Sequence, residues 1–331
     1  GADALRFNII TGNSPGNDTR FYVERCEAMR NFANKLWNAS RFVMMNLTIE
    51  DNKLPETLEL PDKWVLGKLN TLCGEVRENL DKYELGIAAQ KIYDFIWDTF
   101  CDWYIELTKA RLSGSDPKAK ESAERVLLFT LTRILELLHP FMPYITEEIY
   151  QALPHDCEAL IIAPYPKYDP ALAFPEEERS FELVMDAIRA VRSRRADMNV
   201  APSRKAKVIV STAEAATFAA GAPYMERLAS ASEVEVTGPE YEAGPGMVTV
   251  TTHSARLFMP MAELVDLEAE RARLTKELEK AKKQLEAQEK KLANENFVSR
   301  APEAVVNAER ERADKARALI ANLEGSLREL G

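Results

Sequence analysis

Residues 31–42 read NFANKLWNASRF, and this stretch predicts an amphipathic α-helix. At about 100° per residue, its apolar side chains and those of the next turn gather on one face. That face holds Phe32, Ala33, Leu36, Val43, Met44 and Leu47. The other side carries Arg30, Asn34, Lys35, Asn38 and Arg41. A helix with one broad apolar face needs neighbouring helices to cover it, so the stretch indicates a helical bundle.

Phe42 breaks this pattern because it falls on the polar side, between Lys35 and Asn38. An outward ring among cations and amides suits a single-stranded nucleic-acid base, since the ring can stack, the amides can meet base edges and the cations can meet phosphates. Taken alone, the helix fits better with a solvated polar face that carries one exposed phenylalanine, because single exposed apolar residues are common.

The helical period recurs on both sides of this stretch, from the start of the chain to about residue 153. Asp116 followed by Pro117 is a typical helix start, with a short polar cap before proline at the first helical position. Helices are expected at 3–11, 17–47, 62–83, 84–112, 117–139 and 143–153. We therefore expect a helical bundle over residues 17–160, preceded by a segment, 1–16, that continues from another domain. The chain opens on Gly1 in mid-pattern, which suggests a fragment of a longer protein.

After a proline-rich connector, the pattern predicts one more helix and then a change of period. The helix is expected at 175–199. The segments 206–212, 232–238, 246–252 and 255–260 have strand character, with Gly and Pro between them, and predict strands. Two helices, 213–221 and 222–230, are expected between the first two strands. Residues 161–262 are thus predicted to be a linker helix and a small α/β domain.

The last segment shows a heptad pattern in two arms. In the first arm, apolar residues occupy positions 267, 274, 278, 281, 285 and 292. In the second, the residues in register are Val305, Ala316, Leu319, Leu323 and Leu330. Pro302 separates the arms, so residues 263–331 predict an antiparallel coiled-coil hairpin with its tip at 294–302 and a length of about 40 Å. The fold class is therefore mainly α: a bundle, a small α/β linker domain and a C-terminal hairpin.

Composition excludes several classes of function. The chain has 331 residues, a net charge of −10 and no apolar run near the roughly 20 residues that a membrane span needs. Its four cysteines are widely spaced, which fits free thiols in the cytoplasm rather than zinc or disulfides. No catalytic constellation and no metal-ligand cluster is recognisable. Because Pro302 turns the second arm back on the first, we expect a monomer.

Two basic features remain open to interpretation. Arg189, Arg192 and Arg195 recur every three residues and predict a ridge, which either packs against acidic neighbours or contacts nucleic acid. In the hairpin, lysines and arginine approach the tip, although nearby glutamates make the arm almost neutral. The tip candidates are Lys290, Lys291, Phe297 and Arg300.

Six motifs together resemble one family. They are GADALRF at 1–7, SPGND at 14–18, NFANKLWNASRF at 31–42, HPFMPYITEEIYQ at 139–151, IRAVRSRRADMNVAPS at 188–203 and KLANENFVSRAPEAVV at 291–306. In this order they are similar to bacterial valyl-tRNA synthetases. HPFMPYITEEIY is shared with the isoleucyl and leucyl enzymes, whereas the KLANENFVSRAP hairpin is characteristic of the valyl ones.

The resemblance implies a valine tRNA partner. The bundle would bind the anticodon, with Lys35, Arg41 and Phe42 at matching positions; Asn34 and Asn38 are added from their place on the same helix face. The hairpin would contact the outer corner of tRNA, where the D and T arms meet. The HIGH and KMSKS motifs that bind ATP in the family are absent, as is the editing domain. This chain is thus expected to hold no cofactor, with ATP and Mg²⁺ belonging to the parent's catalytic domain, and to have no activity alone.

Two other interpretations stay open. One is an all-α scaffold whose coiled coil mediates protein–protein contact. The other is a member of the same fold that charges a related amino acid, because the amino acid is selected in a domain that this chain lacks.

Overall fold

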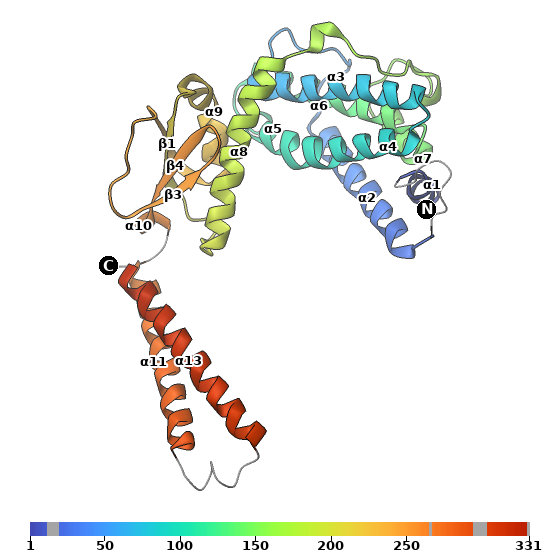
Figure 1. Ribbon diagram of the computed structural model, residues 1–331. Coiled ribbons are helices and arrows are strands. Elements are labelled where there is room, and N and C mark those ends of the chain that lie inside the picture. Colours follow the sequence, from blue (N-terminus) through green and yellow to red (C-terminus); the bar gives the residue numbers. More distant parts are fainter. Residues whose placement is uncertain (12–19, 265–266, 294–302, 330–331) are drawn as a thin grey trace. The chain divides into compact units, whose positions relative to one another are not determined.

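In the computed structural model, which describes residues 1–11, 20–264, 267–293 and 303–329, the stretch 31–42 lies in helix α2, Val23–Asn46 (Figure 1). Phe32, Leu36 and Val43 are fully buried, as their spacing predicts. Ala39 and Ser40 are buried as well, so the covered side is wider than expected. The Ser40 hydroxyl is satisfied within the helix, since it donates to the Leu36 carbonyl oxygen at 2.9 Å.

The chain divides into two compact units, Gly1–Met185 and Asp186–Gly331. The first is helical, as the sequence predicts. Its α-helices and 3₁₀ turns are α1 (Ala2–Ile10), α2, α3 (Leu60–Asp81), α4 (Leu85–Asp94), α5 (Ile105–Leu112), α6 (Pro117–Leu138), α7 (Pro143–Gln151), η2 (Leu160–Ile162), η3 (Pro170–Leu172) and the start of α8 (Pro175–Asp197). Asp116 caps α6 by accepting a hydrogen bond from the Lys118 amide at 2.9 Å. Asn17, a short polar residue that could cap the helix expected at 17–47, lies outside the described residues.

The expected helix at 84–112 is continuous, but it is not α-helical throughout. Between α4 and α5 the chain winds as a π-helix, η1, Phe95–Tyr104. A π-helix bonds residue i to i+5 and has a wider turn than an α-helix. Side chains five positions apart therefore share a side in η1, whereas in an α-helix they would point about 140° apart.

A buried ionic network fixes η1 and α5 against the start of α3. The Asp62 carboxylate is fully buried and receives two hydrogen bonds from the Arg111 guanidinium, at 2.7 and 2.6 Å. The hydroxyl of Tyr104, in η1, donates to the same carboxylate at 2.7 Å. Asp62 also accepts from the Glu59 amide at 3.1 Å and so closes a capping box at the N-terminus of α3. One carboxylate thus joins three segments of the bundle.

The second unit contains a four-stranded sheet in the order β2-β1-β4-β3. The strands are β1 (Ala206–Thr212), β2 (Ala231–Thr237), β3 (Met247–Thr251) and β4 (Ala255–Pro260). β1 and β2 are parallel, and β4 is antiparallel to both of its neighbours. The prediction of two helices between β1 and β2 is wrong. A single helix, α9 (Ala215–Leu228), occupies this position and contains Pro223. The short helix α10, Met261–Leu264, follows β4.

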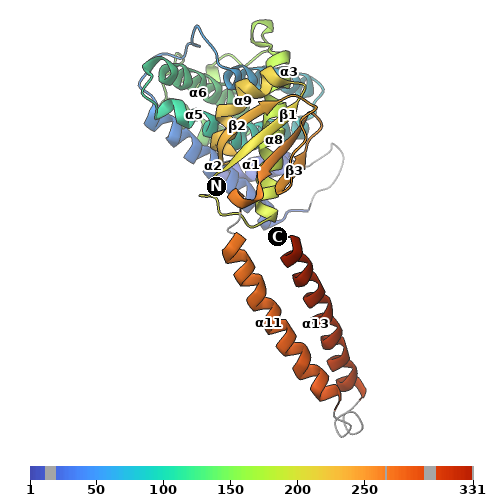
Figure 2. The same cartoon turned by 90° about the vertical axis from the view of Figure 1, so that its left-hand side faces the viewer.

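The last two helices, α11 (Leu267–Leu292) and α13 (Glu303–Glu329), lie side by side (Figure 2). Ion pairs show that they run antiparallel, since Lys282 pairs with Glu324 at 2.8 Å and Glu289 with Arg317 at 2.8 Å. Leu274, Ala281 and Leu323 form the seam, with Leu278 and Ile320 packed against them. The placement of Leu319 in this seam is wrong, because Leu319 is 48% exposed and its neighbour Ile320 takes the inward position. Leu330 and the tip residues 294–302 lie outside the described residues.

Candidate nucleic-acid interface

The polar side of α2 is exposed where the sequence predicts it. Asn34, Asn38 and Arg41 are all exposed, and Met45, one turn further on, is 80% exposed. Because Phe32, Leu36 and Val43 are fixed in the core, the helix cannot rotate to hide this side. We call the surface made by Asn34, Lys35, Asn38, Arg41 and Phe42, together with the groups that pack beside them, the α2 face.

Phe42 itself is partly buried rather than fully outward. The Lys109 ammonium of α5 lies 5.8 Å from the centre of the Phe42 ring. Lys109 is in turn paired with Glu106 at 2.5 Å. The ring therefore lies at the edge of the bundle, with a cation beside it.

Lys35 makes two contacts inside the first unit that its sequence position does not reveal. Its ammonium lies 2.6 Å from the Asp102 carboxylate and 3.7 Å from the centre of the Trp97 ring. The Lys35 side chain is 25% exposed and that of Asp102 is 50% exposed. In the free chain this lysine is thus neutralised and held over an indole ring.

The π-helix explains why Trp97 and Asp102 meet at one lysine. The two residues are five positions apart in η1, so they share the side that faces α2. At the α-helical period the two residues would lie on different sides of the helix, so the sequence pattern does not reveal either contact. The tryptophan and aspartate content of 94–104 is visible in the sequence, but only the π winding brings these two side chains to Lys35.

Trp97 lies at the edge of a cluster of aromatic rings that begins in the core. Phe7 stacks on Phe32 with ring centres 5.4 Å apart, Phe32 lies 4.6 Å from Tyr93, and Tyr93 stacks on Trp97 at 5.7 Å. Burial raises the pKa of Tyr93. The rings of this cluster come from α1, α2, α4 and η1, and Tyr93 supports the Trp97 ring.

The predicted arginine ridge does not form as a single surface. Arg195 is buried and donates to the carbonyl oxygens of Ala201, at 3.4 Å, and Arg204. Burial lowers its pKa. Arg189 pairs with Asp186 at 2.8 Å, whereas Arg192 is exposed. Of the two explanations that the sequence left open, pairing with an acidic neighbour holds for Arg189, whereas Arg195 packs against carbonyl oxygens of its own unit.

At the hairpin, the structure describes two of the four predicted tip residues. Lys290 is exposed and pairs with Glu286 on its own helix at 2.6 Å. Lys291 lies 4.0 Å from Glu309 of α13, a carboxylate that is 9% exposed and also binds Arg312. Phe297 and Arg300 lie outside the described residues. The roles predicted for all four, and for the residues of the α2 face, stay predictions.

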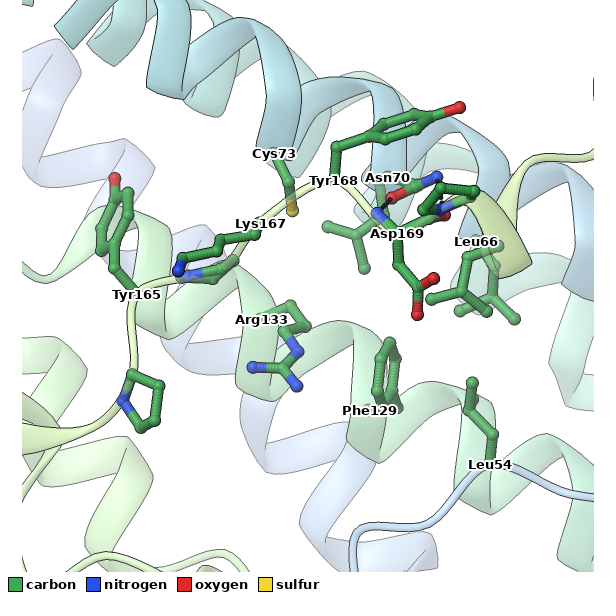
Figure 3. Close-up of a pocket in the computed structure, with 15 residues that line it drawn as sticks. Leu54, Leu66, Asn70, Cys73, Phe129, Arg133, Tyr165, Lys167, Tyr168 and Asp169 are labelled. Atoms are coloured by element: carbon green, nitrogen blue, oxygen red, sulfur yellow. Dashed lines mark hydrogen bonds between the residues drawn. The ribbon is translucent and has the colours of Figure 1, made fainter. Parts of the chain in front are cut away.

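The first unit also contains a cavity of about 540 Å³ under the connector at 164–172 (Figure 3). Its wall includes Leu54 and Phe129, and it carries the positive charges of Arg133 and Lys167 and the negative charge of Asp169. Burial raises the pKa of the Cys73 thiol in this wall to about 12. Charges of both signs line the cavity, which indicates no single class of ligand, and the cavity shares no lining residue with the α2 face.

Within the described residues, no three His, Cys, Asp or Glu side chains come together in a way that could hold a metal ion. Among the same residues, no helix is both long and apolar enough to cross a membrane.

Comparison with known proteins matches two parts of the chain to described domains. Residues 62–210 match the anticodon-binding domain of tRNA ligase, and residues 266–331 match the valyl tRNA synthetase tRNA binding arm. The first match covers η1 and α5, while α2 precedes it. The domain matches therefore define the class: tRNA-binding parts of an aminoacyl-tRNA synthetase.

Whole-chain similarity gives the particular family. The chain is 48% identical to valine–tRNA ligase of Clostridium acetobutylicum over 329 residues, which are 98% of this chain and 37% of that protein. It is 50% identical to valine–tRNA ligase of Clostridium perfringens over 325 residues, which are 97% of this chain and 37% of that protein. The chain belongs to the valine–tRNA ligase family, and it spans about 37% of the length of these relatives.

Proposed function

We propose that this chain is the tRNA-recognition part of a valine–tRNA ligase and that its α2 face binds the anticodon loop of valine tRNA. The observation that carries the proposal is Phe42, a ring at the edge of a rigid helix, flanked by the exposed Asn38 and Arg41. Anticodon bases are single-stranded, so they can stack on an aromatic ring while amides meet their edges and cations meet their phosphates.

The hairpin of α11 and α13 is proposed to contact the outer corner of the same tRNA. Its exposed lysines, Lys290 and Lys291, lie in the last turn of α11, next to the predicted tip. Lysines at such a position would meet phosphates and would fix the orientation of the RNA without reading its sequence.

The chemistry of the parent enzyme is assigned to the rest of the longer protein. There, ATP and Mg²⁺ would serve to attach valine to tRNA, while this chain supplies binding alone and holds no cofactor or metal. The proposal places the protein in the cytoplasm and treats this chain as a monomer. The monomer is favoured because the apolar seam of each hairpin helix is covered by the other helix of the same chain.

The decisive experiment measures the binding of valine tRNA and of unfractionated tRNA across a salt series. Phe42→Ala is expected to weaken binding of valine tRNA by about 1–3 kcal/mol, the usual value of one stacked base. Tyr144→Ala is the matched control, since Tyr144 is an aromatic residue that is 68% exposed on α7, and it should leave affinity unchanged. Both variants should keep the melting temperature of the bundle.

Three outcomes would count against the proposal. One is equal affinity for valine tRNA and unfractionated tRNA. Another is a large loss of stability in Phe42→Ala with unchanged binding, which would make Phe42 a core residue. The third is a dimer that forms with rising protein concentration, which would favour the alternative of a protein–protein scaffold.

A further inference from the structure

The α2 face contains a second aromatic ring that is covered in the free chain. Trp97 stacks on Tyr93 with ring centres 5.7 Å apart, and the Lys35 ammonium covers the Trp97 ring at 3.7 Å from its centre. The only part of this arrangement that can move without disturbing the core is the flexible lysine side chain, which is itself 25% exposed. A ring of this kind becomes a stacking platform as soon as its cap leaves.

RNA binding supplies a reason for the cap to leave. Lys35 is already paired with Asp102 at 2.6 Å, so a phosphate that approaches the same ammonium meets the negative charge of that carboxylate. Lys35 can turn toward the phosphate because the half-exposed Asp102 carboxylate that it leaves is solvated by water. The same movement uncovers Trp97 and leaves the half-exposed Asp102 carboxylate without its cation.

We propose that Trp97 is a second base-stacking platform, covered by Lys35 in the free protein and uncovered when RNA takes the lysine, and that Asp102 then accepts a hydrogen bond from the amino group of the stacked base. Bases that carry an exocyclic amino group, such as cytosine and adenine, fit a carboxylate acceptor, whereas uracil presents a carbonyl oxygen there. The inference rests on the proposed anticodon binding and adds a second reading position to it.

The spacing of the two rings suits two different nucleotides of one loop. Lys35, which covers Trp97, precedes Phe42 by seven residues on the same side of α2, or about 10 Å along the helix axis. Stacked bases of one strand are about 3.4 Å apart, so one base cannot cover both platforms. Bases splayed out of a loop can reach separate platforms.

The test is a set of double-mutant cycles with anticodon stem–loop RNAs, each lacking the base at one loop position. With the intact loop, Trp97→Leu, which keeps an apolar side chain against Tyr93, is expected to weaken binding roughly 5- to 150-fold. This loss should vanish for the RNA that lacks one particular base, and that base should differ from the one that couples to Phe42→Ala. If Trp97→Leu has no effect on binding, or the same effect with every RNA, the second platform is excluded.

The role of Asp102 is tested separately at the loop position that couples to Trp97. The intact protein should prefer an amino-bearing base over uracil there by roughly 10-fold or more, and Asp102→Asn should abolish the preference. Asp98→Asn is the matched control, because Asp98 is an exposed carboxylate of the same π-helix. Loss of the preference in both variants, or in neither, overturns this part of the inference.

Failure of the proposed function looks different from failure of this inference. If the intact protein does not bind the stem–loop, or Phe42→Ala binds it normally, anticodon binding on the α2 face is itself wrong. If Phe42 couples to one base while Trp97 couples to none, the proposal of anticodon binding is supported and the proposal of a second platform is wrong.

Discussion

Removal of the Asp62 carboxylate should destabilise the bundle by about 3 kcal/mol. In Asp62→Ala, the Arg111 guanidinium, whose side chain is 8% exposed, loses both of its hydrogen bonds at 2.7 and 2.6 Å. Breaking a buried pair in this way costs about 3–5 kcal/mol, since a charge is left without a partner. Glu59 lies 3.6 Å from Arg111, is 44% exposed and still neutralises part of the Arg111 charge in the variant. The expected loss is therefore at the lower end of the roughly 3–5 kcal/mol range.

Urea unfolding followed by tryptophan fluorescence measures this loss in the first unit alone. All four tryptophans, Trp37, Trp64, Trp97 and Trp103, belong to Gly1–Met185. Asp81→Ala is the control on the same helix: its partner Arg77 lies at 3.1 Å, but the two side chains are 64% and 56% exposed, so the loss should stay below about 0.5 kcal/mol. Equal losses in the two aspartate variants would refute the reasoning.

A double variant separates the lost ion pair from the stranded charge. Asp62→Leu combined with Arg111→Met leaves neither charge buried, and apolar replacement of a buried pair is often close to neutral. We therefore expect the double variant to be more stable than Asp62→Ala. A double variant that is less stable would show that the hydrogen bonds, and not the stranded charge, dominate.

Two further predictions concern a buried acid and the hairpin seam. Burial raises the pKa of Glu136 above its ordinary value, so the stability that this group contributes is present at pH below 4.5 and is lost as pH rises through its folded-state pKa. In urea titrations at several pH values, Glu136→Gln should therefore gain stability relative to the unmodified chain as pH rises toward neutral; a difference that does not change with pH contradicts this. In the hairpin, Ile320→Ala should cost about 1–2 kcal/mol because the side chain packs in the seam, whereas Leu319→Ala should change stability by less than about 0.5 kcal/mol. Melting of far-ultraviolet circular dichroism measures both, and a larger loss for Leu319→Ala would reverse the assigned register.

Local chemistry predicted most of the helices because their signals are carried by neighbouring residues. The period of apolar residues in 31–47 placed the core side of α2, and the Asp116–Pro117 pair placed the start of α6. The antiparallel hairpin also followed from local pattern, since Pro302 interrupts an otherwise continuous heptad repeat.

The errors arise where two local choices are almost equal in energy. Leu319 and Ile320 are adjacent apolar residues, and only the packing against α11 decides which of them points inward. Pro223 is typical of a helix boundary, yet α9 continues through it. In both cases tertiary contacts decide, and these are not encoded in the local pattern.

The sequence predicts which α2 residues of the candidate site are exposed, but it does not reveal the residues of η1 and α5 that lie beside them. Asn34, Asn38 and Arg41 follow from the helical period alone. Trp97 and Asp102 depend on the π winding of η1, and Lys109 depends on how α5 lies beside Phe42. A sequence period of 3.6 cannot reveal contacts that require a different period on the neighbouring helix.

The charges of the α2 face bear on which RNA it can select. The chain carries a net charge of −10, and the two lysines nearest the aromatic rings are already paired, Lys35 with Asp102 and Lys109 with Glu106. A double-stranded stem offers phosphates but hides its base faces, so at this surface it would compete with carboxylates and gain no stacking. A loop with unstacked bases also gains stacking on the aromatic rings, and this gain offsets the cost of moving each lysine from its carboxylate to a phosphate. The paired lysines thus weaken the attraction of this surface to RNA in general. The surface would distinguish a loop from a stem by the exposure of the bases rather than by charge.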